Sequence, residues 1–367
     1  MSADVINLWM HGGPDALGAP PHDFSTNSNA CGPCPQALAA VQVADATRYP
    51  DPAYTALRQS LADFHGVSPQ RVLLAGSASE FIFRITAWAA GQGARTVHLP
   101  AHPYSDYARA AQAWGLRCET ALPDDEDAVR FTDSNPMTLA WACEPSSPLG
   151  QPHSDWPGWL RDGVAPAAQG SSVLVLDRAY APLRLSGASS LTDAQLDQVW
   201  QLYSPNKALG LTGVRAAYVI APCQDVTRAG GQKVSDVSAL LQMAPSWPVG
   251  AHGVAMLQAW VAPEVQAWLR DSLQTLRDWK FRQIDMLGEL GWTCLPSDAN
   301  FFCARPAQLQ SGKADDAAAR WTAELANLRR AGIKLRDTAS FGLPGHARLG
   351  VLPPTAQEAL RATLATG

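Results

Sequence analysis

The chain has 367 residues, 47% hydrophobic and 17% charged, with a formal net charge of −5, and this length and composition favour a globular protein of two packed domains. The negative charge and the lack of a basic cluster exclude a protein that binds nucleic acid mainly through phosphate contacts. No segment approaches about eighteen consecutive apolar residues and no signal-like region opens the chain, so we expect a cytoplasmic protein without a membrane span.

Residues 1–45 form an arm rich in glycine, proline, asparagine and histidine, with little periodicity. Within it, Cys31-Gly-Pro-Cys34 has the spacing of a thioredoxin-type redox site. That chemistry needs the first cysteine at a helix N-terminus after a strand, and no hydrophobic strand precedes it here. A zinc site would need a second ligand pair, and the remaining cysteines are isolated. We interpret both cysteines as structural loop residues, expect no metal, and leave open whether they ever pair.

From Asp51 onward, short apolar runs alternate with helical segments, which predicts an α/β domain with a mainly parallel sheet over residues 46–250. Pro52 lies near the start of the first helix, which carries Tyr54, Leu57, Leu61 and Phe64 at helical spacing. The predicted strands are Val72–Ala75, Thr96–Leu99, Thr138–Cys143, Val173–Leu176, Gln198–Tyr203 and Ala216–Ile220, and further helices are Ser79–Ala90, Tyr104–Trp114 and Asp155–Arg161.

After Pro248 the sequence changes to long amphipathic helices. One is expected at about Glu264–Leu290, followed by two short strands, a helix at about Asp315–Arg330, a strand at Ala347–Val351 and a final helix. Residues 251–367 therefore predict a smaller α+β domain, which the arm of residues 1–45 joins.

The stretch from Ser204 to Tyr218 reads S-P-N-K-A-L-G-L-T-G-V-R-A-A-Y. A lysine in a mostly apolar pocket has a lowered pKa and can form a Schiff base with a carbonyl, although an arbitrary lysine in a loop is usually a surface residue. The stretch resembles the S-x-x-K-x-x-G-L-x-G-x-R motif of the class I/II aminotransferases, which use pyridoxal 5'-phosphate (PLP). The resemblance implies the aspartate aminotransferase-like fold (PLP fold type I), with Lys207 holding the cofactor and with Ser204 and Arg215 binding its phosphate.

Two further stretches match cofactor contacts of this family. Small residues in Ala75–Glu80, between a strand and a helix, allow backbone N–H groups to face a phosphate, and we assign Ser77, Ala78 and Ser79 to it. In Pro100–Tyr107 the resemblance implies that Tyr104 stacks on the cofactor ring. We interpret Tyr107 as part of the buried face of the next helix.

The apolar run Val173–Tyr180 ends in a carboxylate, which is costly to bury unless it meets a cation. The resemblance implies that Asp177 pairs with the protonated ring nitrogen of PLP, which keeps the ring electron-poor. Tyr180 matches the tyrosine that hydrogen-bonds to the phenolic oxygen of the cofactor.

The turn Cys143–Gly150 departs from the family pattern. Ser147 stands where an asparagine normally donates to the phenolic oxygen, and Glu144 replaces another asparagine. Serine can still donate one hydrogen bond from a shorter side chain. Asn206, beside the lysine, is a second departure. These changes leave a non-catalytic homologue as an alternative.

The motifs His11-Gly-Gly13, Asp23–Asn27, Gly32-Pro33 and Arg48–Pro52 resemble the threonine-phosphate decarboxylases of cobalamin biosynthesis, relatives of the histidinol-phosphate aminotransferases. The resemblance covers nearly the whole chain and implies a homodimer in which Tyr49 reaches the cofactor phosphate of the neighbouring subunit. Within the arm, Asn27 and His11 are candidate substrate contacts, although His11 is equally consistent with a flexible tail.

Near the C-terminus, the resemblance implies that Arg348 binds the α-carboxylate of a substrate and Arg336 a second anionic group, as a guanidinium group can do through paired hydrogen bonds. Asn300 matches an asparagine of the family's small domain. Two guanidinium groups suit a substrate with a carboxylate and a phosphate. The resemblance of the N-terminal motifs makes L-threonine O-3-phosphate decarboxylation the first hypothesis and histidinol-phosphate-type transamination the second. The sequence alone does not decide which bond at Cα breaks.

Overall fold

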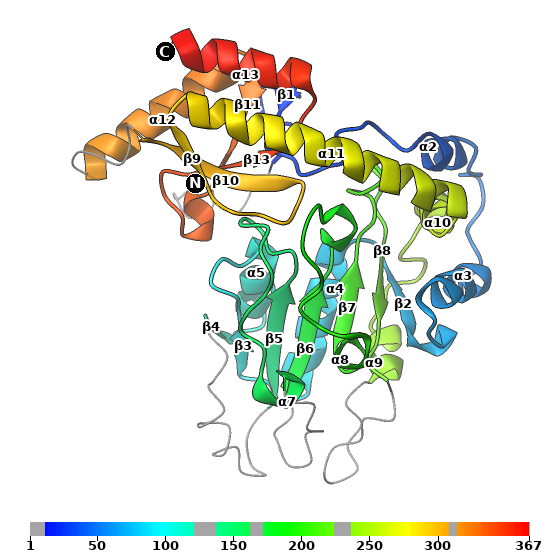
Figure 1. Cartoon of the computed structure of the whole chain (residues 1–367). Coiled ribbons are helices and arrows are strands. Elements are labelled where there is room, and N and C mark those ends of the chain that lie inside the picture. Colours follow the sequence, from blue (N-terminus) through cyan, green and yellow to red (C-terminus); the bar gives the residue numbers. More distant parts are fainter. Residues whose placement is uncertain (1–11, 121–136, 162–171, 224–235, 308–313, 367) are drawn as a thin grey trace.

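The computed structural model describes residues 12–120, 137–161, 172–223, 236–307 and 314–366. The chain is built around one large sheet, with two smaller sheets and three long helices above it (Figure 1). No helix in these ranges is both long enough and apolar enough to cross a membrane.

The large sheet has seven strands, and six of them run in one direction while β8 runs against them. In sheet order the strands are β2 (Val72–Ala75), β8 (Ala217–Ile220), β7 (Trp200–Tyr203), β6 (Ser172–Asp177), β5 (Thr138–Cys143), β3 (Thr96–His98) and β4 (Arg117–Glu119). The central strands are mostly apolar because helices cover both faces of the sheet.

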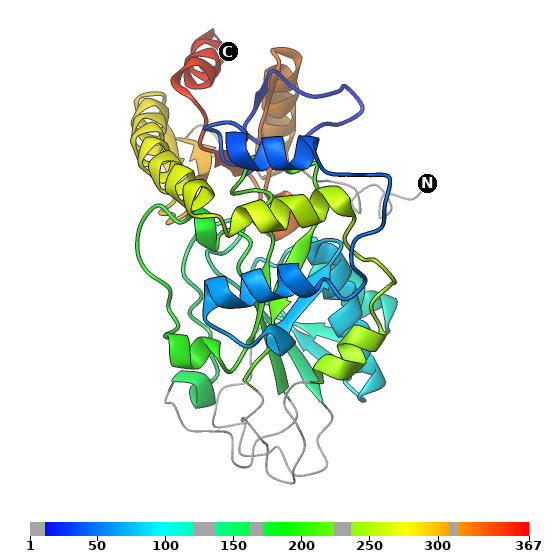
Figure 2. The same cartoon turned by 90° about the vertical axis from the view of Figure 1, so that its right-hand side faces the viewer.

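The alternation of side chains along β2 shows how the two faces are covered. Val72 and Leu74 belong to the same buried cluster as helices α3 (Thr55–His65) and α10 (Ala251–Trp260). Leu73 and Ala75 point to the opposite face, in a cluster with helices α4 (Ala78–Gly91), α5 (Ser105–Ala113) and α9 (Val237–Gln242). The short helices α7 (Gly158–Arg161) and α8 (Asp193–Leu196) complete the α3 side, where α2 (Pro35–Gln42) stacks on α10 (Figure 2).

The smaller sheets join the two ends of the chain. Four antiparallel strands have the order β12 (Arg336–Asp337), β13 (Ala347–Gly350), β10 (Phe301–Pro306) and β9 (Trp292–Cys294). In the arm, β1 (His22–Asp23) pairs in parallel with β11 (Ile333–Lys334), so the arm is anchored to the C-terminal third of the chain.

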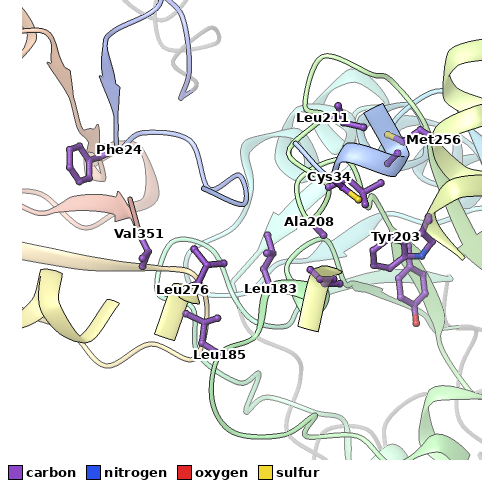
Figure 3. Close-up of a cluster of buried hydrophobic side chains, with 14 of the residues drawn as sticks. Phe24, Cys34, Leu183, Leu185, Tyr203, Ala208, Leu211, Met256, Leu276 and Val351 are labelled. Carbon is purple, nitrogen blue, oxygen red and sulfur yellow. The ribbon is translucent and has the colours of Figure 1, made fainter. Parts of the chain in front are cut away.

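The helices α11 (Pro263–Glu289), α12 (Ala314–Arg330) and α13 (Pro354–Thr366) lie in the upper part of the molecule (Figure 1). Helix α11 contributes to a buried hydrophobic cluster that unites the arm, the large sheet and the small sheets. Figure 3 shows part of this cluster, with Phe24 and Cys34 of the arm, Tyr203 of β7 and Leu276 of α11. Apolar packing therefore fixes the arm against both parts of the structure that contribute to the site.

Most predicted elements are confirmed, and β2 and β5 agree with the prediction residue for residue. The predicted helix at Asp155–Arg161 is wrong, because only Gly158–Arg161 is helical. Pro157 explains the late start, since a proline disfavours helical geometry in the residue before it. Helix α2 is absent from the prediction, because only one of its residues, Ala37, is buried and its apolar periodicity is weak.

Lys280 lies on the buried side of α11, where its ammonium donates to the carbonyl oxygens of Ser297 and Ala299. Burial lowers its pKa from 10.5 to about 8. Between these two pH values the unfolded chain holds a proton at this site that the folded chain has lost. The free energy of unfolding therefore rises with pH across this window, by roughly 3 kcal/mol in total from this group.

We expect the free energy of unfolding of the wild type, minus that of Lys280→Met, to increase with pH between about 8 and 10.5. Denaturant titrations at several pH values measure this difference, in which the contributions of other titrating groups cancel. A difference that stays constant with pH would contradict the lowered pKa.

Candidate active site

The expected site residues meet at one edge of the large sheet. Ser77 follows β2, Tyr104 follows β3, Asp177 ends β6 and Ser204 follows β7, so all four lie at carboxyl ends of strands that run in the same direction. Arg215 precedes β8, whose reversed direction brings its start to the same edge. Ligands of open α/β sheets bind at this edge. One pocket of about 220 Å³ is lined by Asn27, Ser77, Ala78, Ser79, Tyr104, Ser147, Asp177, Tyr180, Ser204, Lys207, Arg215, Arg336 and Arg348.

Lys207 lies in a turn that the arm holds in place. Its carbonyl oxygen accepts hydrogen bonds from the backbone N–H groups of Asn29 at 2.9 Å and Gly210 at 3.2 Å. Gly210 has a φ of +68°, and a Cβ there would lie 2.7 Å from the carbonyl oxygen of Gly32. The glycine is therefore required by the arm that crosses this turn. The Lys207 ammonium lies 5.4 Å from the centre of the Tyr180 ring, inside the pocket.

Asp177 is buried at the floor of the pocket. Its carboxylate accepts from the Tyr107 hydroxyl at 2.7 Å and from the backbone N–H of Ala179 at 2.9 Å. Burial raises the pKa of this carboxyl group, while the two hydrogen bonds and the nearby charge of Lys207 act in the opposite direction. No cation in the described ranges lies within ion-pair distance of Asp177.

Other residues that line the pocket suit an anion. Ser77 is the N-cap of α4, and its hydroxyl accepts from the Glu80 N–H at 3.0 Å, which leaves the first N–H groups of the helix for a ligand. The Ser204 hydroxyl is buried and has no hydrogen-bond partner among the residues that the structure describes. Arg215 is exposed at the rim of the pocket.

Asn27 of the arm lines the pocket, whereas Asn300, next to β10, supports the arm from outside it. Asn27 lines it and donates to the Tyr180 hydroxyl at 3.3 Å. Asn300 does not line it; its amide donates to the carbonyl oxygens of Asn27 and Ser28 at 3.2 and 3.3 Å. Asn300 thus positions the arm residue that reaches the pocket.

Arg336 and Arg348 are direct cross-strand partners on β12 and β13, so their side chains share one face. Both are buried, and their guanidinium groups lie 5.2 and 5.8 Å from the centre of the Phe341 ring. Burial and the charge of Arg348 lower the pKa of Arg336 to about 10. Like charges opposite each other are unfavourable, so an anion that binds both would relieve the repulsion.

The residues that depart from the family pattern lie in different environments. Ser147 lines the pocket, and its hydroxyl accepts from Arg348 at 3.0 Å. Glu144 lies outside the pocket lining and forms an ion pair with Arg184 at 2.7 Å. Asn206 lines the pocket, where its amide donates to the carbonyl oxygen of Val214 at 3.3 Å and braces the turn around Lys207.

Comparison with known proteins decides the family, because the sequence profile described as "Aminotransferase class I and II" matches residues 20–365. The chain belongs to the class I and II aminotransferase family. It is 28% identical to a histidinol-phosphate aminotransferase of Jannaschia sp. (strain CCS1) over 98% of this chain and 95% of that one.

Solved structures with this fold include two relevant neighbours. A histidinol-phosphate aminotransferase from Sinorhizobium meliloti in complex with pyridoxal-5'-phosphate has a TM-score of 0.71 at 21% identity, covering 93% of this chain and 90% of that one. An L-threonine-O-3-phosphate decarboxylase from Porphyromonas gingivalis has a TM-score of 0.69 at 20% identity, covering 94% and 98%. At these identities the likeness shows the fold alone.

The pocket fits PLP, the cofactor of this family. The buried carboxylate of Asp177, which lacks a cationic partner in the described ranges, suits a protonated ring nitrogen, and the unpartnered Ser204 hydroxyl beside the start of α4 suits a phosphate. Lys207 lines the same pocket. When bound to an amino acid, the cofactor supplies an electron sink for the charge that develops at Cα. The individual roles of these residues remain predictions.

The structure confirms Tyr107 as a residue of the buried face of α5 and adds a contact with the site. It belongs to the buried cluster beneath α5 and stacks on Trp141 with ring centres 4.4 Å apart, as expected for a core residue. However, its hydroxyl reaches the carboxylate of Asp177. The available signal was its position three residues after Tyr104, which places both tyrosines near the start of one helix.

Tyr107→Phe is expected to keep the stacking on Trp141 but to raise the pKa of Asp177, because one of the two hydrogen bonds to the carboxylate is lost. A hydrogen bond to a charged group contributes about 1.5–3 kcal/mol, so kcat should fall by about tenfold or more. The acidic limb of the pH–rate profile should move to higher pH. Tyr203→Phe, which removes a buried hydroxyl bound to Gln201, is the matched control. An unchanged acidic limb would argue against this role.

The remaining predicted residues lie away from the pocket or outside the described ranges. Tyr49 is 77% exposed and stacks on Trp247 with ring centres 4.4 Å apart. His11 lies outside the described residues. Cys34 is buried and Cys31 is half-buried, both thiols are free, and burial raises the pKa of Cys31 to about 11. Within the described ranges no group of three or more His, Cys, Asp or Glu side chains could hold a metal.

Proposed function

We propose that this enzyme acts at the Cα of a small phosphorylated amino acid, with decarboxylation of L-threonine O-3-phosphate as the first candidate reaction. The observation that carries the proposal is the pair Arg336 and Arg348, which are buried cross-strand neighbours facing the pocket of Lys207. Among the residues that the structure describes, four cations and one carboxylate line this pocket. Lys207 and Arg215 suit the cofactor, which leaves two guanidinium groups for two anionic groups of a substrate.

In this proposal Arg348 binds the α-carboxylate and Arg336 binds the phosphate, each through paired N–H groups. These contacts orient the Cα substituents relative to the cofactor plane. Tyr104 covers the pocket and restricts water, and Lys207 moves the proton at Cα. The orientation that Arg348 gives the α-carboxylate would decide whether CO2 or the Cα proton is lost, and PLP, when bound, would supply the electron sink for either reaction.

Histidinol-phosphate-type transamination is the second candidate. The relative from Jannaschia is named for that activity, and the chain spans nearly all of its length. The same arginine pair would bind a phosphorylated amine in one half-reaction and a dicarboxylate amino donor in the other.

Incubation of the PLP-loaded protein with O-phosphothreonine separates the two candidates. Release of CO2 with formation of an amino-alcohol phosphate supports the first. Formation of a keto acid, or conversion of histidinol phosphate only in the presence of an acceptor keto acid, supports the second. Absence of turnover with every phosphorylated amine would sink both and favour a non-catalytic homologue.

We also propose that the enzyme is a homodimer and that Tyr49 contacts the cofactor phosphate of the neighbouring subunit. The exposed, stacked ring of Tyr49 lies outside its own pocket, which supports a contact with a second chain. Tyr49→Ala should weaken the binding of PLP. Light scattering shows whether the protein is a dimer. A monomer with full activity would contradict the proposal.

A further inference from the structure

Arg348 is held by three segments that are far apart in the sequence. It lies on β13, its Nη1 donates to the Ser147 hydroxyl at 3.0 Å, and its Nη2 donates to the carbonyl oxygen of Ser25 at 2.9 Å. Ser147 belongs to the loop after β5 of the large sheet, and Ser25 belongs to the arm. The guanidinium group also lies 5.6 Å from the centre of the Phe301 ring. The position of the guanidinium group therefore depends on contacts with Ser147, Ser25 and Phe301.

These contacts leave part of the guanidinium group available. Arginine has five N–H groups, and the hydrogen bonds to Ser147 and Ser25 use two of them. The buried Nε of Arg348 has no partner among the described residues. The remaining N–H groups can thus form the paired hydrogen bonds that a carboxylate requires, provided that the plane of the group is fixed.

Ser147 is the side chain that fixes this plane from the large sheet. Its hydroxyl is nearly buried and acts as the acceptor, and Ser146 beside it has a different role, since its hydroxyl accepts from the backbone N–H of Gln151 at 3.1 Å. The serine that stands where the family has an asparagine therefore faces the substrate arginine. Its hydroxyl oxygen accepts from that arginine before any ligand arrives, and its O–H remains available as a donor.

We propose that Ser147 is a positioning residue for the substrate carboxylate, acting through Arg348, rather than a residue that mainly tunes the phenolic oxygen of the cofactor. The inference rests on the proposed function for the role of Arg348. Ser147, which replaces the asparagine of the family pattern, would thus help to orient the substrate.

Two ligands without an amino group test this proposal, because neither can react with the cofactor. They are 3-phosphonooxypropanoate, which carries a carboxylate and a phosphate, and succinate, which carries two carboxylates. Calorimetric titration of the PLP-loaded protein gives the Kd of each. Ser147→Ala should raise both Kd values about tenfold, because a hydrogen bond to a charged group is lost. Ser147→Thr, which keeps the hydroxyl, should stay within about threefold of the wild type, and Ser146→Ala should match it.

The visible absorbance of the bound cofactor, titrated with pH, distinguishes positioning from ring tuning. We expect the same midpoint in the wild type, Ser146→Ala and Ser147→Ala. Kd values for Ser147→Ala within twofold of the wild type would overturn the inference, whether or not the midpoint moves. Failure of the wild type to bind either ligand would overturn it as well. Binding of succinate but not of 3-phosphonooxypropanoate would reject the phosphorylated substrate alone, and succinate would then decide the role of Ser147.

Discussion

Replacement of Lys207 by alanine is expected to lower kcat by about four orders of magnitude, the upper range for loss of a general acid–base group. Lys207 is the only lysine among the described residues that line the pocket, so no neighbouring amine can take over its proton transfer. The variant should also release PLP on dialysis, because the covalent link is gone. Turnover of the substrate that the wild type accepts and the absorbance of dialysed protein measure the two effects.

Lys280→Met is the matched control for this variant, since Lys280 is a buried lysine whose ammonium binds carbonyl oxygens outside the pocket. It should keep its cofactor and lose stability rather than turnover. A Lys207→Ala protein that retains PLP and more than about a tenth of the wild-type kcat would be incompatible with the assigned role.

Asp177→Asn is expected to have the second-largest effect. Asparagine keeps the size of the side chain, but its single oxygen replaces only one of the two carboxylate oxygens that accept from Tyr107 and Ala179, and it has no charge to pair with a protonated ring nitrogen. Breaking a buried ion pair costs about 3–5 kcal/mol, so kcat should fall by about 10² to 10³. KM should change less, because the arginines that bind the substrate are untouched.

Steady-state kinetics of Asp177→Asn should be compared with those of Asp106→Asn. Asp106 is also a buried carboxylate, but it pairs with Arg109 at 2.8 Å and does not line the pocket. Equal losses of kcat in the two variants would mean that Asp177 contributes only to folding.

The sequence predicts six of the seven strands of the large sheet because these strands are buried and mostly apolar, as in Val173–Leu176. It does not predict the edge strand β4, whose residues Arg117–Glu119 are polar and partly exposed. It does not predict β1 and β11, since strands of two residues carry no periodic signal. Their pairing joins residues that are more than 300 positions apart, such as His22 and Ile333. Only tertiary structure reveals such contacts.

In the candidate site, too, the sequence predicts some features and misses others. Lys207, Asp177 and Arg215 lie in or beside stretches whose residue pattern is distinctive, and the structure places them around one pocket. The hydrogen bonds from Tyr107 to Asp177 and from Arg348 to Ser147 connect different elements of the chain, so no local pattern carries them. The proximity of the Phe341 ring to both guanidinium groups, at 5.2 and 5.8 Å, is likewise recognisable only from the tertiary structure.

The most direct test of the central claim is to locate the covalent attachment of PLP. The loaded protein is reduced with borohydride, digested, and analysed by mass spectrometry. We predict a pyridoxyl group on the peptide that contains Lys207 and loss of the visible absorbance on reduction. Attachment at Lys280, Lys334 or any other lysine, or no attachment, would contradict the assignment of this pocket as the active site.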